Sequence, residues 1–218
     1  MNKIISKYKF PLFILIFSLI LTIASLLFTL KQKKVSEASY EKFLQEQLIL
    51  KEIQAKQKIY LMGKFDPEQK EDFLLIPWQY TINGSKMYLR RETLDVFLKM
   101  RDAAEKKGVD LKIASATRNF NYQKNIWNNK WNGLMLVNGK NLAKSIPDGL
   151  SRFKKILEYS SVPGTSRHHW GMDIDINDAN PEYFKTEKGK KVYEWLTKNA
   201  WKFGFCQPYN LKNNNRQT

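Results

Sequence analysis

An uncharged stretch of 21 residues near the amino terminus constrains this chain more than any other feature of its sequence. The stretch covers residues 10–30 and contains no Asp, Glu, Lys or Arg. About 20 apolar residues in helical conformation are enough to cross the hydrocarbon core of a bilayer. We therefore expect a transmembrane helix over 10–30, a basic cytoplasmic amino terminus over 1–9, and a domain that folds separately from both.

The charges around this stretch do not fix its orientation alone, because three lysines precede it and three follow it, at 3, 7, 9, 31, 33 and 34. The apolar run is longer than that of a cleaved signal peptide, and Ser36-Glu37-Ala38 is a poor cleavage site. We interpret the segment as an uncleaved single-pass anchor. The amino terminus is then inside the cell and the folded domain outside.

Residues 31–64 are polar and typical of a helix, with scattered apolar positions but no sustained heptad pattern. We expect a helical stalk, and a monomer rather than a coiled-coil dimer. Phe65-Asp66-Pro67 interrupts this pattern, since proline cannot continue a helix. We place the folded domain at 65–218.

Periodicity and capping signals within that domain predict helices over 91–107, through Gln123 and Trp127, from Asp148 to Glu158, and over 186–202. Short strands are expected over 109–114 and from Met172 onward, and 131–147 is expected to be a loop or short hairpin. This order of elements favours the α+β class, with helices against a small, mostly antiparallel sheet.

The chain is strongly basic, with 37 Lys and Arg against 21 Asp and Glu and a formal net charge of +16. Such an excess favours anionic partners in general. The basic residues are scattered, and the sequence contains no recognisable nucleic-acid-binding module, so we expect no nucleic acid partner. A single cysteine, Cys206, excludes an internal disulfide framework.

Chemically versatile side chains are concentrated in residues 166–176. This segment holds both histidines of the chain, His168 and His169, together with Asp173 and Asp175. Alternation from Met172 predicts a strand whose two aspartates face away from the core. Imidazole and carboxylate are the usual ligands of catalytic zinc, although a histidine–aspartate pair is also common as a purely structural hydrogen bond. Both interpretations are open at this point.

The same segment resembles the S-x-H-x-x-G-x-A-x-D signature of the VanY-like zinc D-alanyl-D-alanine carboxypeptidases. Ser166, His168, Gly171 and Asp175 match the signature, whereas Asp173 stands where the family usually has a small residue. The resemblance extends from about residue 73 to 209. It implies that His168 and Asp175 are zinc ligands. Asp173 is then either an orienting or amine-binding group or a solvated residue.

A second part of the resemblance lies after the strand predicted at 109–114. Arg118 and Gln123 match the arginine and glutamine of the family, while Asn119 replaces a more usual serine. The resemblance implies that Arg118, Gln123 and Ser166 hold the peptide substrate, and that Arg118 stabilises the oxyanion. Arginine at a helix start opposes the helix dipole unless an anion is near, which favours this role over that of a surface arginine.

Members of the family continue into a Glu-x-Trp-His segment that supplies the general base and the third zinc ligand, and this chain has none before Thr218. We therefore expect a carboxyl-terminally incomplete relative whose activity is in question. The function implied is zinc-dependent removal of a terminal D-alanine from peptidoglycan stem peptides, with D,D- and L,D-specificity both open, at the outer side of a bacterial membrane. The alternative is a non-catalytic protein that binds wall peptides.

Overall fold

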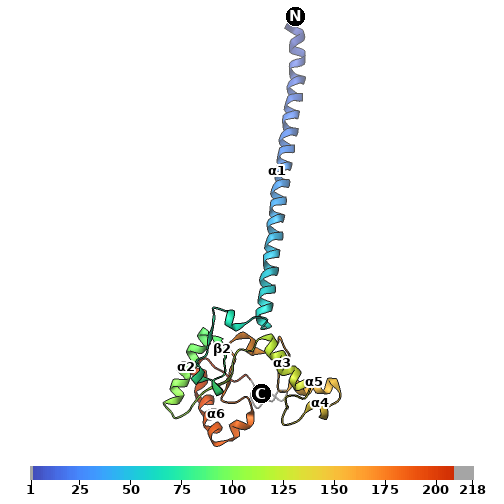
Figure 1. Cartoon of the computed structure of the whole chain (residues 1–218). Coiled ribbons are helices and arrows are strands. Elements are labelled where there is room, and N and C mark those ends of the chain that lie inside the picture. The colour runs from blue at the N-terminus through green and yellow to red at the C-terminus, as the bar shows by residue number, and fades with distance from the viewer. Residues whose placement is uncertain (1, 209–218) are drawn as a thin grey trace. The chain divides into compact units, whose positions relative to one another are not determined.

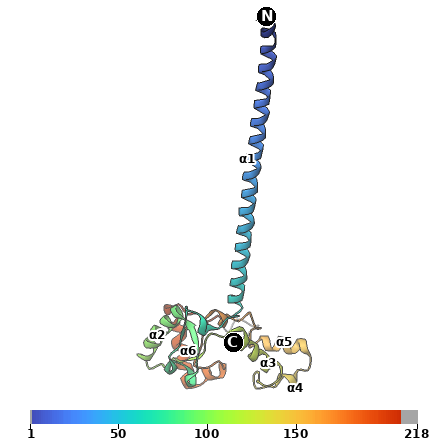
Figure 2. The same ribbon diagram turned by 45° about the horizontal axis from the view of Figure 1, so that its top comes forward.

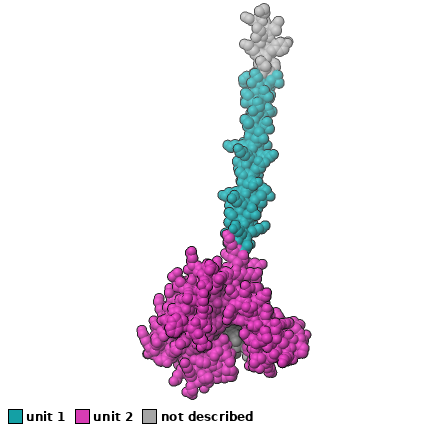
Figure 3. Space-filling view, viewed as in Figure 1, with its two compact units in different colours: residues 1–55 teal, residues 56–218 magenta. Residues whose placement is uncertain are grey.

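The computed structural model describes the backbone of residues 2–208 and the side chains from Phe13 onward. Two compact units are distinguished in Figure 3, Met1–Ala55 and Lys56–Thr218. The side chains of the predicted basic segment 1–9 lie outside the described residues. Residues 209–218 also lie outside the described residues. They include Tyr209, where the resemblance ends, and the segment for which we predicted a carboxyl-terminally incomplete domain.

The first unit consists of a long helix, α1 (Asn2–Leu61), whose last residues are counted with the second unit. No glycine or proline occurs between residues 12 and 62, and Gly63 follows with φ +68°. The helix contains a stretch long and apolar enough to cross a membrane, and none of that stretch is buried. The expected helical conformation of both the apolar segment and the stalk is confirmed.

The second unit contains four short strands in the part of the chain that the structure describes. β1 (Phe73–Leu75) pairs antiparallel with β2 (Tyr88–Arg90). β3 (Ile113–Ser115) pairs antiparallel with β4 (Asp175–Ile176), and an irregularity in register separates the two pairs of this ladder. The α+β class is confirmed. The strands form two small sheets rather than the single sheet that we expected.

Helices make up most of the rest of this unit, and they are ordered along the chain as labelled in Figure 1. The α-helices are α2 (Arg91–Glu105), α3 (Phe120–Trp131), α4 (Leu142–Ser145), α5 (Gly149–Leu157) and α6 (Glu187–Asn199). Single 3₁₀ turns occupy Pro67–Gln69, Trp78–Tyr80, Ile82–Gly84, Arg167–Trp170, Pro181–Lys185 and Ala200–Phe203.

Side-chain caps explain where three of these helices begin. Asn119, Asp148 and Thr186 each accept a hydrogen bond from a backbone N–H in the first turn of α3, α5 and α6, respectively. Such a cap satisfies one of the donors that a helix start leaves unpaired. The cap predicted at Asp148 is confirmed. The helix predicted over 186–202 begins as expected after Thr186, and α6 ends at Asn199.

Two apolar clusters hold the second unit together. The larger one gathers around α2 and β3 and includes Phe97, Met100, Leu111 and Ile113, each fully buried. A smaller one contains Val137, Leu142 and Ile156. Figures 1 and 2 agree that α2 and α6 lie on one side of this unit and that α3, α4 and α5 lie on the other. The segment between β3 and α3 therefore connects the two clusters.

Candidate active site

The site is built where that connecting segment meets the turn that carries both histidines. Arg118 N–H donates to the carbonyl of His168 at 3.1 Å. The Nδ1 atom of His168 lies 2.8 Å from the carbonyl oxygen of Ala116, and that of His169 lies 2.5 Å from the carbonyl oxygen of Arg118. These three contacts fasten residues 116–118 to the 3₁₀ turn Arg167–Trp170.

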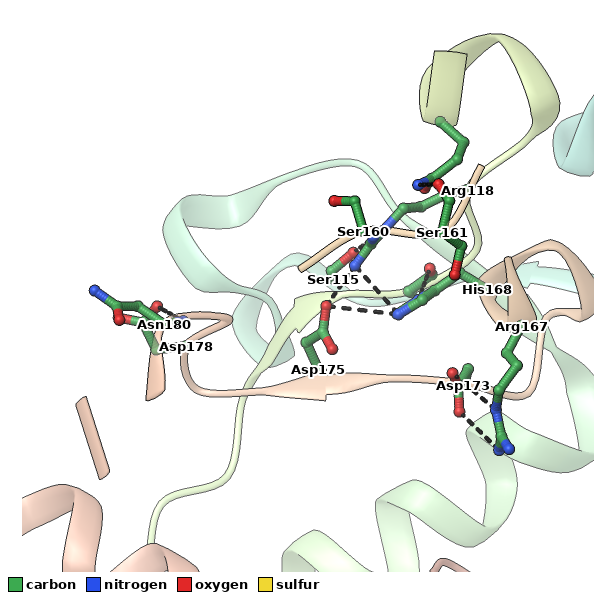
Figure 4. A network of polar contacts seen from close by, with 12 residues as sticks. Ser115, Arg118, Ser160, Ser161, Arg167, His168, Asp173, Asp175, Asp178 and Asn180 are labelled. Atoms are coloured by element: carbon green, nitrogen blue, oxygen red, sulfur yellow. Dashed lines mark hydrogen bonds and ion pairs between the residues drawn. The ribbon is translucent and has the colours of Figure 1, made fainter. Parts of the chain in front are cut away.

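His168 and Asp175 approach each other across this junction. The Nε2 atom of His168 is 3.6 Å from the Oδ2 atom of Asp175, and the histidine is buried (Figure 4). Because a carbonyl oxygen can only accept a hydrogen bond, Nδ1 carries the imidazole proton and donates it to Ala116. Nε2 is therefore left with a lone pair directed toward the carboxylate, as in histidines that bind metals.

The guanidinium of Arg118 lies between these two groups. Its Nη2 atom donates to Asp175 Oδ2 at 2.5 Å and lies 3.2 Å from His168 Nε2, while its Nε atom donates to Ser115 Oγ at 2.8 Å. A positively charged group thus occupies the place to which a nitrogen lone pair and a carboxylate oxygen both point. The donor set suits a cation, and zinc at this place requires Arg118 to turn away from Asp175.

Charge balance at Asp175 supports the same conclusion. Burial alone raises the pKa of this carboxyl group, but its contacts with His168, followed by those with Arg118, outweigh burial and hold the pKa below its ordinary value. Asp175 is therefore an anion when the cluster is intact.

The sequence analysis did not identify Ser115 as a site residue. Its position at the end of the predicted strand was the available signal.

A catalytic zinc usually has three protein ligands. Within the described residues, no group of three or more His, Cys, Asp or Glu side chains gathers closely enough to bind a metal. His168 and Asp175 therefore fit zinc as two of its ligands. Their role as metal ligands stays a prediction.

Gln123 and Ser166 are buried in the site region but are not joined to this cluster by side-chain hydrogen bonds. Gln123 lies on α3, donates through Nε2 to the carbonyl of Ser161 at 2.8 Å, and leaves its buried Oε1 without a hydrogen-bond partner among the described residues. Ser166 precedes the histidine turn, and its carbonyl accepts from His169 N–H at 3.1 Å. Their predicted contacts with substrate remain predictions.

Asp173 lies before β4 and pairs with Arg167 rather than with the cluster at Asp175. It accepts hydrogen bonds from Arg167 Nε and Nη2 at 3.3 and 3.2 Å, and Figure 4 shows this pair apart from the cluster at Asp175. The strand is also shorter than expected, since β4 covers two residues and Met172 is 48% exposed. Gly171, with φ +75°, turns the chain here and delays the extended conformation.

His169 has a supporting place in the cluster, which the sequence did not reveal. It is fully buried, it donates through Nδ1 to the Arg118 carbonyl, and its Nε2 atom accepts from Gly164 N–H at 3.0 Å. Both ring nitrogens are satisfied in the neutral form, and burial lowers the pKa of His169. The ring therefore fixes the backbone of Arg118, and neither nitrogen is available to a metal.

Comparison with known proteins identifies the family of the chain. Residues 86–218 match the VanY family, described as D-alanyl-D-alanine carboxypeptidase. The chain belongs to this family. Every residue of the cluster, from Ser115 to Asp175, lies within the matched range.

Three individual proteins illustrate the likeness. A putative carboxypeptidase, YodJ, of Bacillus subtilis (strain 168) is 29% identical over 158 residues, which is 68% of this chain and 49% of that protein. A D-alanyl-D-alanine carboxypeptidase of Enterococcus faecalis (strain ATCC 700802 / V583) is 30% identical over 145 residues, 62% of this chain and 47% of that protein. The chain thus spans about half the length of the curated relatives that it matches.

Among solved structures, the peptidoglycan-recognising LD-carboxypeptidase LdcB superposes with a TM-score of 0.49 at 26% identity, over 69% of this chain and 63% of that one.

Proposed function

We propose that this chain is a zinc-dependent carboxypeptidase that removes the terminal D-alanine of a peptidoglycan stem peptide. The observation that carries the proposal is the cluster in which the Nε2 lone pair of His168 and the carboxylate of Asp175 are directed at one cationic group. Membership of the VanY family supports the reaction. The choice of zinc comes from the resemblance of residues 166–175 to the signature of the zinc carboxypeptidases.

His168 and Asp175 would hold the metal through Nε2 and Oδ2. When bound, zinc supplies Lewis acidity, which makes water a better nucleophile and polarises the peptide carbonyl. The carbonyl of Ala116 keeps the imidazole of His168 in the tautomer that leaves Nε2 free to bind. Arg118, once released from Asp175, becomes a donor for the oxygen on which negative charge develops.

Gln123 and Ser166 contribute to substrate binding in this proposal. The unsatisfied Oε1 of Gln123 is an acceptor for a backbone N–H of the peptide. A buried acceptor without a donor is costly, so a substrate donor there adds to affinity. The long apolar helix α1 would anchor the chain in the membrane of a bacterium, with the second unit facing the cell wall.

A non-catalytic wall-peptide binding protein is the second candidate. It is favoured by one observation, namely that Arg118 pairs with Asp175 at the place that zinc would take. A protein of this kind would retain peptide binding through Arg118, Gln123 and Ser166 without hydrolysis.

Release of D-alanine by the full chain in detergent micelles separates these candidates. The substrates are a stem pentapeptide ending in D-Ala-D-Ala and a tetrapeptide ending in L-Lys-D-Ala, each assayed with zinc and with a chelator. We expect zinc-dependent release that disappears in Asp175→Asn and persists in Asp173→Asn, a matched change of a neighbouring carboxylate. Binding without release would establish the second candidate, and neither binding nor release would refute both.

A further inference from the structure

A half-buried lysine close to the site has no counter-charge in the part of the chain that the structure describes. Lys130 lies near the end of α3, and its Nζ atom donates to Ser160 Oγ at 2.5 Å. Ser160 is itself buried, with 6% of its surface exposed. No carboxylate within residues 2–208 forms an ion pair with Lys130. A partly buried ammonium group without an anion costs free energy, which an anionic ligand would recover.

Lys130 is also under the influence of a second cation. Burial, followed by the charge of Arg118, lowers the pKa of Lys130 to about 8. Arg118 in turn has one carboxylate partner, Asp175. Two cations and one carboxylate leave an excess positive charge in this region, and that excess grows if Asp175 is engaged by a metal. An anion that enters between the two cations is therefore stabilised by both.

Lys130 and Gln123 lie on the same face of α3, which we call the Gln123–Lys130 face. They are seven residues apart, which is close to two full helical turns, so both lie on the same helix face. Gln123 donates to the carbonyl of Ser161, and Lys130 donates to the side chain of Ser160. In Figure 4, Ser160 and Ser161 are drawn at the Arg118 side of the polar network. This face of α3 is thus next to the Arg118 side of the site, where the end of a peptide would bind in the proposed function.

We propose that Lys130 binds, together with Arg118, the free α-carboxylate of the last residue of the substrate peptide. The inference rests on the proposed function and adds to it the residue that makes a free carboxyl terminus a requirement. Lys130 then exchanges a neutral acceptor, Ser160 Oγ, for a charged one, and hydrogen bonds between charged groups are roughly twice as strong as neutral ones. A peptide whose terminus is amidated offers no such gain.

Binding of two peptides to the full chain in detergent tests this inference. The probes are acetyl-L-Lys-D-Ala-D-Ala as the free acid and as the carboxyl-terminal amide, titrated calorimetrically in the presence of a chelator so that hydrolysis does not intervene. We expect the wild type to favour the acid by about tenfold or more. Lys130→Met should reduce that preference at least about fivefold, while Lys130→Arg should keep most of it.

Two further variants separate a charge effect from a structural one. Lys124→Met removes an exposed lysine of the same helix and should leave the preference unchanged. Ser160→Ala removes the hydrogen bond to Lys130 but not the charge, and should retain the preference. If Ser160→Ala abolishes the preference as fully as Lys130→Met does, Lys130 merely holds the Gln123–Lys130 face in place and the inference is wrong.

The outcomes also distinguish the inference from the function on which it rests. If the wild type binds neither peptide and releases no D-alanine with zinc, both are overturned. A wild type that releases D-alanine while Lys130→Met keeps the full acid preference overturns the inference alone. Thermal unfolding of each variant establishes that a changed preference comes from a folded protein.

Discussion

Gly171 is a position where a single methyl group should disturb the site. It ends the turn that carries His168 and His169, it has φ +75°, and its carbonyl accepts from Arg90 N–H at 3.1 Å. A Cβ atom built there would lie 2.4 and 2.7 Å from two atoms of the Phe73 ring and 2.8 Å from Arg90 Cγ. Gly171→Ala therefore combines an unfavourable backbone conformation with a steric clash.

Gly204 provides a matched control for the backbone part of this effect. Its φ is +83°, and a Cβ atom there meets nothing within 4 Å. The left-handed conformation costs a residue with a side chain about 1–2 kcal/mol at either position. Overpacking against a buried ring adds about 1–3 kcal/mol at Gly171 alone. We expect Gly204→Ala to lose about 1–2 kcal/mol and Gly171→Ala to lose about 2–5 kcal/mol of unfolding free energy.

Urea unfolding of the two full-length variants, followed by tryptophan fluorescence, measures this difference. For a domain of this size the additional loss in Gly171→Ala corresponds to a melting temperature about 2–12 °C below that of Gly204→Ala. Equal destabilisation of the two variants would show that Phe73 does not pack closely against this turn. Phe73 of β1 would then give the histidine turn no support.

Three other changes test the surroundings of the site. His169→Ala leaves the Arg118 carbonyl and the Gly164 N–H without partners, so urea unfolding should show a loss of at least about 2 kcal/mol; a loss below about 1 kcal/mol would contradict this. Glycine at position 177 tolerates the φ of 62°, but Asn177→Gly deletes three side-chain hydrogen bonds. The variant should lose about 1.5–4 kcal/mol of unfolding free energy in the same assay, and an unchanged free energy would show that these bonds do not form. Lys130 has a pKa of about 8 in the folded chain and an ordinary pKa of 10.5 in the unfolded chain. Between these pH values the unfolded chain binds more protons than the folded chain, so the free energy of unfolding rises with pH. Unfolding at pH 7.5 and 9.5 should show that rise in the wild type relative to Lys130→Met, and parallel pH profiles would refute it.

Local signals made the helices of this chain predictable. The helix predicted over 91–107 is α2, with Leu94, Phe97 and Ala104 buried as their spacing indicated. The cap Asp148 and the helix start at Thr186 were predictable because a cap depends on a residue only three positions away. Within residues 131–147, which were expected to be a loop or short hairpin, Asn138-Gly139 forms a tight turn with Val137 paired to Lys140. The helix α4 in the same segment was not predicted.

Strand lengths and ion pairs were less predictable, because they depend on residues far apart in sequence. β3 and β4 are shorter than the apolar patterns suggested, since the ladder between them is irregular. The alternating pattern predicted Asp173 on the same strand face as Asp175, but Asp173 forms an ion pair with Arg167 of the preceding turn. The interaction of Arg118 with Asp175 joins residues 57 positions apart, and no local pattern encodes it.

The central proposal is that His168 and Asp175 hold one zinc ion. Calorimetric titration of the full chain with zinc tests it most directly. We expect one equivalent to bind to the wild type and to Asp173→Asn, and binding to be lost in both His168→Ala and Asp175→Ala. Zinc binding by His168→Ala with unchanged affinity and stoichiometry would contradict the proposal.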